Sequence, residues 1–157
     1  SRSMRWPSNE KTIKVRVMEL LLQAMATKRL FFEGFEMAKT ILVIDDSASL
    51  RQVVRMALVG AGYNVIEAGD GQAALALLDG RQVNMAVCDV NMPIMNGIEF
   101  VKAVKALPSY KFMPILMLTT ESQEEKKEQG KAAGAKAWMV KPFSPTQLVN
   151  AVSKLCV

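Results

Sequence analysis

The chain has 157 residues, half of them hydrophobic, and a net charge of +5, which fits one globular domain with an ordinary core. It contains no histidine, which excludes His-based zinc sites, Ser-His-Asp triads and a histidine phosphodonor. No stretch reaches the roughly eighteen uninterrupted apolar residues of a membrane span. The two cysteines, Cys88 and Cys156, make no disulfide framework, and we expect them buried in a protein of the reducing cytoplasm.

The positive charge is spread unevenly along the chain. Residues 1–36 hold seven basic and four acidic residues, a net +3, whereas residues 37–157 hold thirteen basic and eleven acidic residues, a net +2. Because most of the excess lies in the leading segment, charge gives only weak support for nucleic-acid binding. We expect neither nucleic acid nor a membrane among the partners.

The first 36 residues form an N-terminal extension of the domain that starts at Met37, a residue equally suited to be the natural start. Its first three residues resemble a cloning remnant. Ile13, Val15 and Val17 alternate as in a strand, and residues 18–30 are helix formers. We expect the extension to have no role in the chemistry, and to pack on the domain or to self-associate with a neighbouring copy.

From Thr40 onward, short apolar runs alternate with helical periodicity, the pattern of βα units and a parallel sheet. In chain order we predict a strand at 40–44, a helix at 50–61, a strand at 63–68, a helix at 71–78, a strand at 85–88, a helix at 98–106, a strand at 114–118, a helix at 122–133, a strand at 137–140 and a helix from 145 onward. Gly62 can end the first helix, and Ser144 with Gln147 gives the last one a capping box. Residues 37–157 therefore predict a doubly wound, three-layer α/β domain.

Polar side chains follow four of the five predicted strands. Asp45 and Asp46 come after the first strand, Asp89 after the third, Thr119 after the fourth and Lys141 after the fifth. The carboxyl ends of the strands in such a sheet meet at one edge, where ligands bind. Each residue alone could be a solvated loop residue or a helix cap, which we favour for Asp46 or Ser47 taken singly. Together they indicate a functional site.

The residues at this edge have a coherent chemistry. Three carboxylates held close together repel one another and raise at least one pKa unless a cation lies between them. Without histidine or paired cysteines, a set of oxygen ligands favours Mg2+. Such a site can hold a phosphate donor in line with a carboxylate, which is a competent nucleophile for making an aspartyl phosphate. Lys141 would stabilise the transferred group, and Thr119 would bond it afterwards.

Four motifs make the comparison specific: Ile44-Asp-Asp-Ser47, Cys88-Asp-Val-Asn-Met-Pro93 with Gly97, Leu118-Thr119, and Val140-Lys-Pro-Phe143. Over residues 39–157 the chain resembles the receiver domain of two-component response regulators, above all the stand-alone chemotaxis regulators of the CheY type. The resemblance implies a flavodoxin-like sandwich whose five parallel strands lie in the order 2-1-3-4-5.

The same resemblance assigns roles to the site residues. It implies phosphorylation of Asp89, and a Mg2+ held by Asp46, Asp89 and the backbone carbonyl of Asn91, with Asp45 reaching the metal largely through water. Lys141 would pair with Asp89 before phosphorylation and with the phosphoryl group after it. The family also implies a cis bond before Pro142, a form nearly confined to X-Pro bonds.

Three further positions are expected to tune the signal. Asn91 and Glu121 lie where receivers vary and where polar groups can order an attacking water, so we expect a short-lived phosphoryl group. Trp138 stands where the family usually has Tyr or Phe as a switch aromatic that turns inward when Thr119 moves toward the phosphate. Its bulk, and Thr120 where the family prefers Ala or Gly, argue against the usual rotation and leave a packing role open.

No output domain is predicted after the last helix, so we expect the message to pass by protein binding. The resemblance implies a CheA-like sensor histidine kinase as input, the flagellar motor switch protein or another protein as output, and a phosphatase. The main alternative is a phosphate shuttle or sink in a non-motility phosphorelay. We expect no turnover of external substrates.

Three other classes fit less well. A haloacid-type phosphatase needs a second carboxylate two residues after its nucleophile, where this chain has Asn91. A flavodoxin-like cofactor binder needs a Gly- and Ser/Thr-rich phosphate loop, which does not follow the first strand. An inactive receiver that serves only as a scaffold is disfavoured because every acidic position is filled.

Overall fold

The structure, a computed structural model, describes residues 8–36, 38–120 and 124–157. The chain divides into two compact units, Ser1–Ala38 and Lys39–Val157. The division lies two residues after the domain start expected at Met37.

The described residues of the first unit form one long helix, α1 (Ser8–Glu36). The strand predicted around Ile13, Val15 and Val17 is wrong, because all three residues lie inside this helix. A short alternating run forms a strand only where a partner accepts its backbone hydrogen bonds, and here the neighbouring residues are strong helix formers. None of the described helices combines the length and the apolar character of a membrane span.

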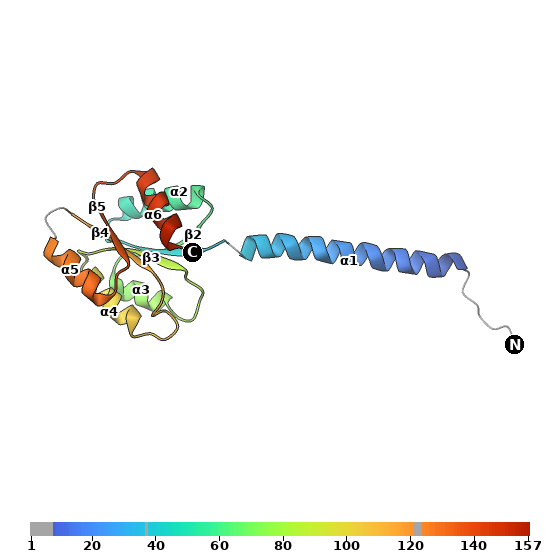
Figure 1. The fold of residues 1–157 in the computed structure, drawn as a ribbon, viewed down its shortest axis with the longest axis horizontal. Coiled ribbons are helices and arrows are strands. Elements are labelled where there is room, and N and C mark those ends of the chain that lie inside the picture. The colour runs from blue at the N-terminus through green and yellow to red at the C-terminus, as the bar shows by residue number, and fades with distance from the viewer. Residues whose placement is uncertain (1–7, 37, 121–123) are drawn as a thin grey trace. The chain divides into compact units, whose positions relative to one another are not determined.

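The second unit is a five-stranded parallel sheet in the predicted order β2-β1-β3-β4-β5, with helices on both faces (Figure 1). Its elements are β1 (Thr40–Ile44), α2 (Ala48–Gly60), β2 (Asn64–Ala68), α3 (Gly71–Leu77), β3 (Met85–Asp89), α4 (Gly97–Lys105), β4 (Ile115–Thr119), α5 (Glu124–Ala133), β5 (Ala137–Val140) and α6 (Pro145–Leu155). Their ends lie within two residues of the predicted ones. Residues 122 and 123 of the predicted fourth helix lie outside the described residues.

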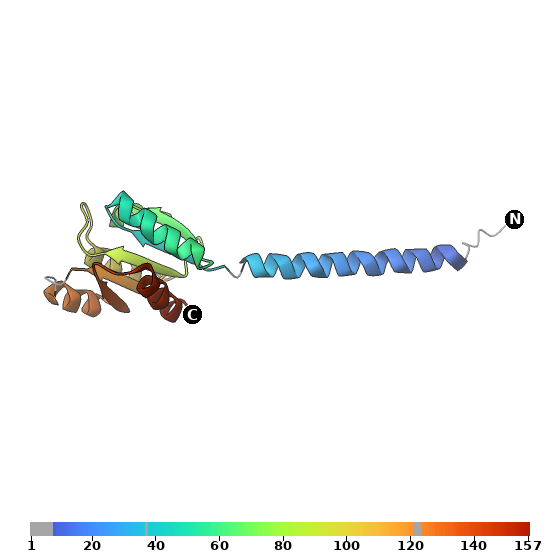
Figure 2. The ribbon, with the colours of Figure 1, turned by 90° about the horizontal axis from the view of Figure 1, so that it is seen from above.

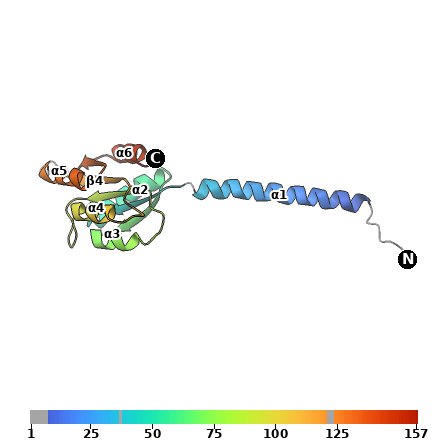
Figure 3. The same cartoon turned by 60° about the horizontal axis from the view of Figure 1, so that its bottom comes forward.

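Two hydrophobic cores lie on opposite faces of the sheet. Along β1, Leu42 and Ile44 point into the core under α3 and α4, whereas Ile41 and Val43 point into the core under α2 and α6. Figure 2 looks onto the face with α2 and α6, and Figure 3 turns the face with α3 and α4 forward. Because side chains of a strand alternate in direction, burial on both faces requires the nearly continuous apolar runs seen in the sequence.

Local signals in the sequence fix several element ends. The side chain of Ser47 accepts a hydrogen bond from the backbone of Leu50 and caps α2, as favoured from the sequence. Gly62 follows α2 with a φ of +96°, a conformation that glycine adopts without strain. The capping box of Ser144 and Gln147 is confirmed, and the Lys141–Pro142 bond is cis, as the resemblance implied.

The loop between β3 and α4 contains a strained turn centred on Ile94. The backbone N–H of Met95 donates to the carbonyl of Pro93 at 2.7 Å, and Ile94 between them has a φ of 69°. Positive φ is unfavourable for a β-branched residue, and the Ile94 side chain is 75% exposed, so its own packing recovers little of the strain.

Replacing Ile94 by Asn is expected to stabilise the protein by about 1 kcal/mol, because Asn tolerates positive φ far better than a β-branched residue. Urea denaturation would measure the free energy of unfolding. Ile94→Val keeps the β-branch and serves as the matched control with no expected gain. An Asn variant no more stable than the wild type would contradict the strain argument.

Candidate functional site

The site lies at the carboxyl edge of the sheet, where the strand ends are aligned by their pairing. Ile44 of β1 is opposite Cys88 of β3, Asp89 is opposite Leu118 of β4, and Thr119 is opposite Val140 of β5. The residues that follow these partners, Asp45 and Lys141, are thereby brought to the same edge as Asp89. The structure thus brings together the polar groups that the sequence placed at strand ends.

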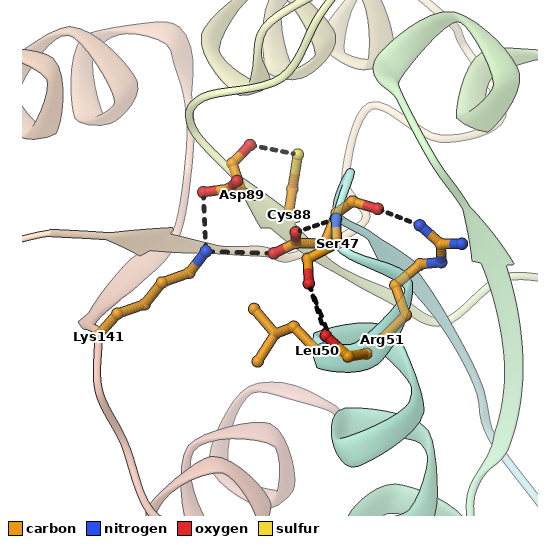
Figure 4. Close-up of polar contacts among 8 residues, drawn as sticks. Ser47, Leu50, Arg51, Cys88, Asp89 and Lys141 are labelled. Carbon is orange, nitrogen blue, oxygen red and sulfur yellow. Dashed lines mark hydrogen bonds and ion pairs between the residues drawn. The ribbon is translucent and has the colours of Figure 1, made fainter.

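Lys141 joins two of the carboxylates directly. Its Nζ lies 3.2 Å from Oδ2 of Asp45 and 3.2 Å from Oδ1 of Asp89 (Figure 4). Asp45 is 1% and Asp89 7% exposed, so both carboxylates are largely removed from water. The pair with Asp89 that the resemblance implied is present, and Asp45 is a second partner of the same ammonium.

Burial and charge act against each other on these groups. Burial raises the pKa of Asp89 above its ordinary value; Lys141 lowers it and Asp45 raises it, and the net direction is upward. The expected raised carboxylate pKa is therefore found at Asp89, although burial rather than repulsion is its main cause. Partial burial lowers the pKa of Lys141, but the charges of Asp89 and Asp45 outweigh burial and raise it overall.

Asp45 is held in place from two sides. The backbone N–H of Ser47 donates to Oδ1 of Asp45 at 2.9 Å, and the Arg51 guanidinium donates to the backbone carbonyl of Asp45 (Figure 4). Arg51 also pairs with Glu67 of β2, its Nε lying 3.3 Å from Oε1. These contacts join the end of β1 to α2 and β2, and they hold Asp45 in its present position.

The three acidic side chains form a potential cation site. One carboxylate oxygen from each of Asp45, Asp46 and Asp89 lies within 4.8 Å of the others; Asp46 is exposed and the other two are buried. An all-oxygen set open to water on one side suits Mg2+, which keeps several waters and takes a few carboxylates. The residues therefore fit this ion. The backbone carbonyl of Asn91 as a further ligand stays a prediction.

Gly97 lets α4 begin directly against the main chain of Asp89. A Cβ atom at this position would lie 2.3 Å from the backbone oxygen of Asp89 and 3.0 Å from Cα of Val90. The N–H of Gly97 donates to the carbonyl of Val90 at 2.8 Å, which holds the two segments together. The glycine of the sequence motif is thus required by close backbone approach.

Gly97→Ala is expected to lower the free energy of unfolding by about 2–3 kcal/mol, because backbone rather than a flexible side chain must move to admit the methyl group. The matched control is Gly60→Ala in α2, where a new Cβ would meet nothing within 4 Å. That substitution should stabilise by about 0.5–1 kcal/mol through helix propensity. Urea denaturation of both variants measures the contrast, and equal effects would contradict it.

Of the two positions expected to tune phosphoryl lifetime, Asn91 and Glu121, the structure describes Asn91. The exposed side chain of Asn91 accepts a hydrogen bond from Nζ of Lys126, in the first turn of α5, at 2.6 Å. Glu121 lies outside the described residues. The structure therefore gives a partner for one member of the pair only.

Thr119 and Trp138 lie on neighbouring strands beyond Asp89. Thr119 is 3% exposed, and its carbonyl accepts the N–H of Lys141 at 2.7 Å. Trp138 is partly buried against the core under α3 and α4, and Nζ of Lys127 lies 4.7 Å from its ring centroid. A cation over the indole face favours the present position of the ring.

Comparison with known proteins identifies the family of this fold. Residues 41–153 match the response regulator receiver domain. The chain belongs to the response regulator receiver family. It is 34% identical over 116 residues to the chemotaxis protein CheY of Pseudomonas aeruginosa, which covers 73% of this chain and 94% of that protein. A structure of CheY4 from Vibrio cholerae is 49% identical with a TM-score of 0.72 and covers 75% of this chain and 98% of that one.

A second kind of relative carries the receiver within a longer protein. The phosphate regulon regulator PhoB of P. aeruginosa is 39% identical over 111 residues, 71% of this chain, but the match covers 48% of PhoB. The chain thus spans about half the length of that relative and nearly all of CheY. It is a CheY-like receiver domain of a two-component response regulator.

Sequence reasoning missed two residues that this receiver places at the site. Arg51 braces Asp45, and Lys126 holds Asn91. Arg51 lies six residues after Asp45 in the first turns of a predicted helix, where a side chain can reach back toward the preceding strand end. No comparable signal existed for Lys126, because its partner lies 35 positions away in the chain.

Proposed function

We propose that Asp89 accepts a phosphoryl group from a histidine kinase with Mg2+ bound at the acidic site, and that the phosphorylated domain signals by binding another protein. The observation that carries this proposal is the Lys141 ammonium, 3.2 Å from a carboxylate oxygen of both Asp45 and Asp89. Family membership supports the same chemistry.

Asp89 is the best-placed acceptor of the three carboxylates. The Asp45 side chain is 2% exposed and is also bonded by the backbone of Ser47, whereas the Asp89 side chain is 10% exposed and contacts Lys141. In the transfer, an Asp89 oxygen bonds phosphorus while the bond from phosphorus to the donor's histidine nitrogen breaks, and its electron pair stays on that nitrogen.

The residues around Asp89 have separate roles in this scheme. Lys141 neutralises charge on the phosphoryl oxygens, and the buried Thr119 hydroxyl donates to one of them after transfer. Bound Mg2+ would supply further charge neutralisation at the Asp45, Asp46 and Asp89 oxygens. After hydrolysis the carboxylate is regenerated, so the domain acts as a switch rather than as an enzyme on external substrates.

The direct test is incubation with acetyl phosphate and Mg2+, followed by mass spectrometry of the intact protein and its peptides. The proposal requires one added phosphoryl group, located on Asp89, that depends on the metal. Asp89→Asn is the control and should remain unmodified. Modification elsewhere, or none in the wild type, would refute the assignment.

For partners, we propose a CheA-like kinase as donor and the flagellar motor switch protein as output, in the cytoplasm. The likeness to CheY proteins over nearly their whole length supports this choice. The alternative is a phosphate shuttle or sink between kinases. Pull-down of motor switch protein with phosphorylated and unphosphorylated protein separates the two, since only the first requires phosphorylation-dependent binding.

We also propose that α1 mediates self-association. Val15, Met18, Leu22 and Met25 follow the spacing of a two-stranded coiled coil, and each is about 60% exposed or more. A second copy of the same helix would cover them. Light scattering of the full chain against a chain starting at Met37 tests this; the same number of chains per particle in both would exclude it.

A further inference from the structure

The side chain of Asn91 is tied to a different element from the one that carries it. Nζ of Lys126, on α5, lies 2.6 Å from Oδ1 of Asn91, although the two residues are 35 positions apart. The distance is short even for a bond donated by a charged group. Both residues are exposed, so burial does not force this contact.

Asn91 is also linked to Asp89. Its backbone N–H donates a hydrogen bond to the Asp89 carboxylate, two residues earlier in the chain. The backbone of Asn91 is therefore in contact with the carboxylate that would carry the phosphoryl group, while its exposed side chain is held by Lys126. The contact with Asn91 connects Lys126 to this part of the site.

An Asn side chain has one accepting end and one donating end. A water that attacks a phosphoryl group gives up a proton, and it is oriented by a group that can accept its hydrogen bond. In Asn91 that group is Oδ1, the atom bonded to Lys126. The ammonium therefore competes with the attacking water for the same oxygen.

We propose that Lys126 is a positioning residue that prolongs the life of the phosphoryl group on Asp89 by occupying the amide oxygen of Asn91. The inference rests on the proposed phosphorylation of Asp89 and adds a regulator of its hydrolysis. In that step the water oxygen bonds phosphorus, the bond to the Asp89 oxygen breaks with its electron pair returning to the carboxylate, inorganic phosphate leaves, and a water proton passes to solvent.

The experiment follows decay of the phosphorylated protein after acetyl phosphate is removed, with Mg2+ present. Lys126→Met keeps much of the side-chain length and removes the donor. Its phosphoryl group should decay roughly three to ten times faster, the size expected for losing one exposed charge-assisted hydrogen bond. Lys126→Arg keeps a cationic donor and should decay at the wild-type rate.

Two controls distinguish the specific contact of Lys126 with Asn91 from a general effect of its positive charge. Lys131→Met removes the same charge from an exposed position of α5 and should leave decay unchanged. In an Asn91→Ala background, Lys126→Met should have no further effect, because the oxygen it occupied is gone. A purely electrostatic role for Lys126 would instead accelerate decay in both backgrounds and would overturn the proposal.

The outcomes also distinguish the inference from the function on which it rests. If wild-type protein takes up no phosphoryl group on Asp89, both fail. If uptake is normal but Lys126→Met decays like the wild type, only the role of Lys126 fails.

Discussion

Asp89→Asn is expected to abolish phosphoryl uptake and, at neutral pH, to raise the free energy of unfolding by about 1–3 kcal/mol. The gain follows from the raised pKa of the buried Asp89 carboxyl. Asn has the same shape without the charge, and Lys141 keeps Asp45 as its partner.

The pH dependence of this gain has a definite sign. Because the pKa of Asp89 is higher in the folded than in the unfolded protein, its contribution to stability is full below the unfolded value and is lost as pH rises through the folded one. Asp89→Asn does not lose this stability. Its free energy of unfolding should therefore exceed that of the wild type by an amount that grows from acidic toward neutral pH and then levels off. Urea denaturation of both proteins across this range measures it.

Asp79 provides a control of opposite sign. Hydrogen bonds from the exposed Arg81 lower the pKa of Asp79 to about 2, so its ionised form is favoured in the folded protein. Asp79→Asn therefore cannot gain stability with rising pH. A gain in Asp79→Asn equal to that in Asp89→Asn would show that removing any acidic charge from the protein is enough.

Lys141→Met is expected to have the second large effect. Removing the ammonium leaves two buried carboxylates without their shared partner, which should lower the free energy of unfolding by about 2–4 kcal/mol at neutral pH. Phosphorylation of Asp89 should slow by roughly a hundredfold or more, since a preorganised charge at the transferred group is lost.

The lost stability should return in two ways. Protonation of Asp89 at acidic pH removes the repulsion, and Mg2+ replaces the missing positive charge, so the deficit of the variant should shrink under both conditions. Unfolding in urea with and without Mg2+ measures this recovery. Lys131→Met, at an exposed position of α5, is the control. A deficit unaffected by both pH and Mg2+ would show that Lys141 acts through packing.

The strand ends were predictable because they depend on two simple regularities. Apolar runs located β1, β3, β4 and β5, and parallel topology requires that their carboxyl ends share an edge. Asp45, Asp89, Thr119 and Lys141 follow from that rule alone. Nothing beyond spacing and order was needed to expect them together.

Contacts between side chains of different elements were not predictable in the same way. The sharing of Lys141 between Asp45 and Asp89 depends on side-chain direction at the end of β5, and the contact of Lys126 with Asn91 depends on how α5 lies beside the β3–α4 loop. Neither direction nor packing is encoded in residue spacing. The false strand in α1 arose because three alternating residues satisfy the strand pattern without any partner.

The contacts that hold Asp45 make the β1 side of the site different from the β5 side. On one flank Arg51 clamps the tip of β1 to Glu67, while on the other β5 is an outer strand whose four residues are all at least partly exposed. With Asp89 phosphorylated as proposed, the added charge would lie between the end of β1, which is held by side-chain contacts, and the partly exposed outer strand β5. We expect the larger structural change on the β5 side, where a binding protein can reach the exposed residues of that strand.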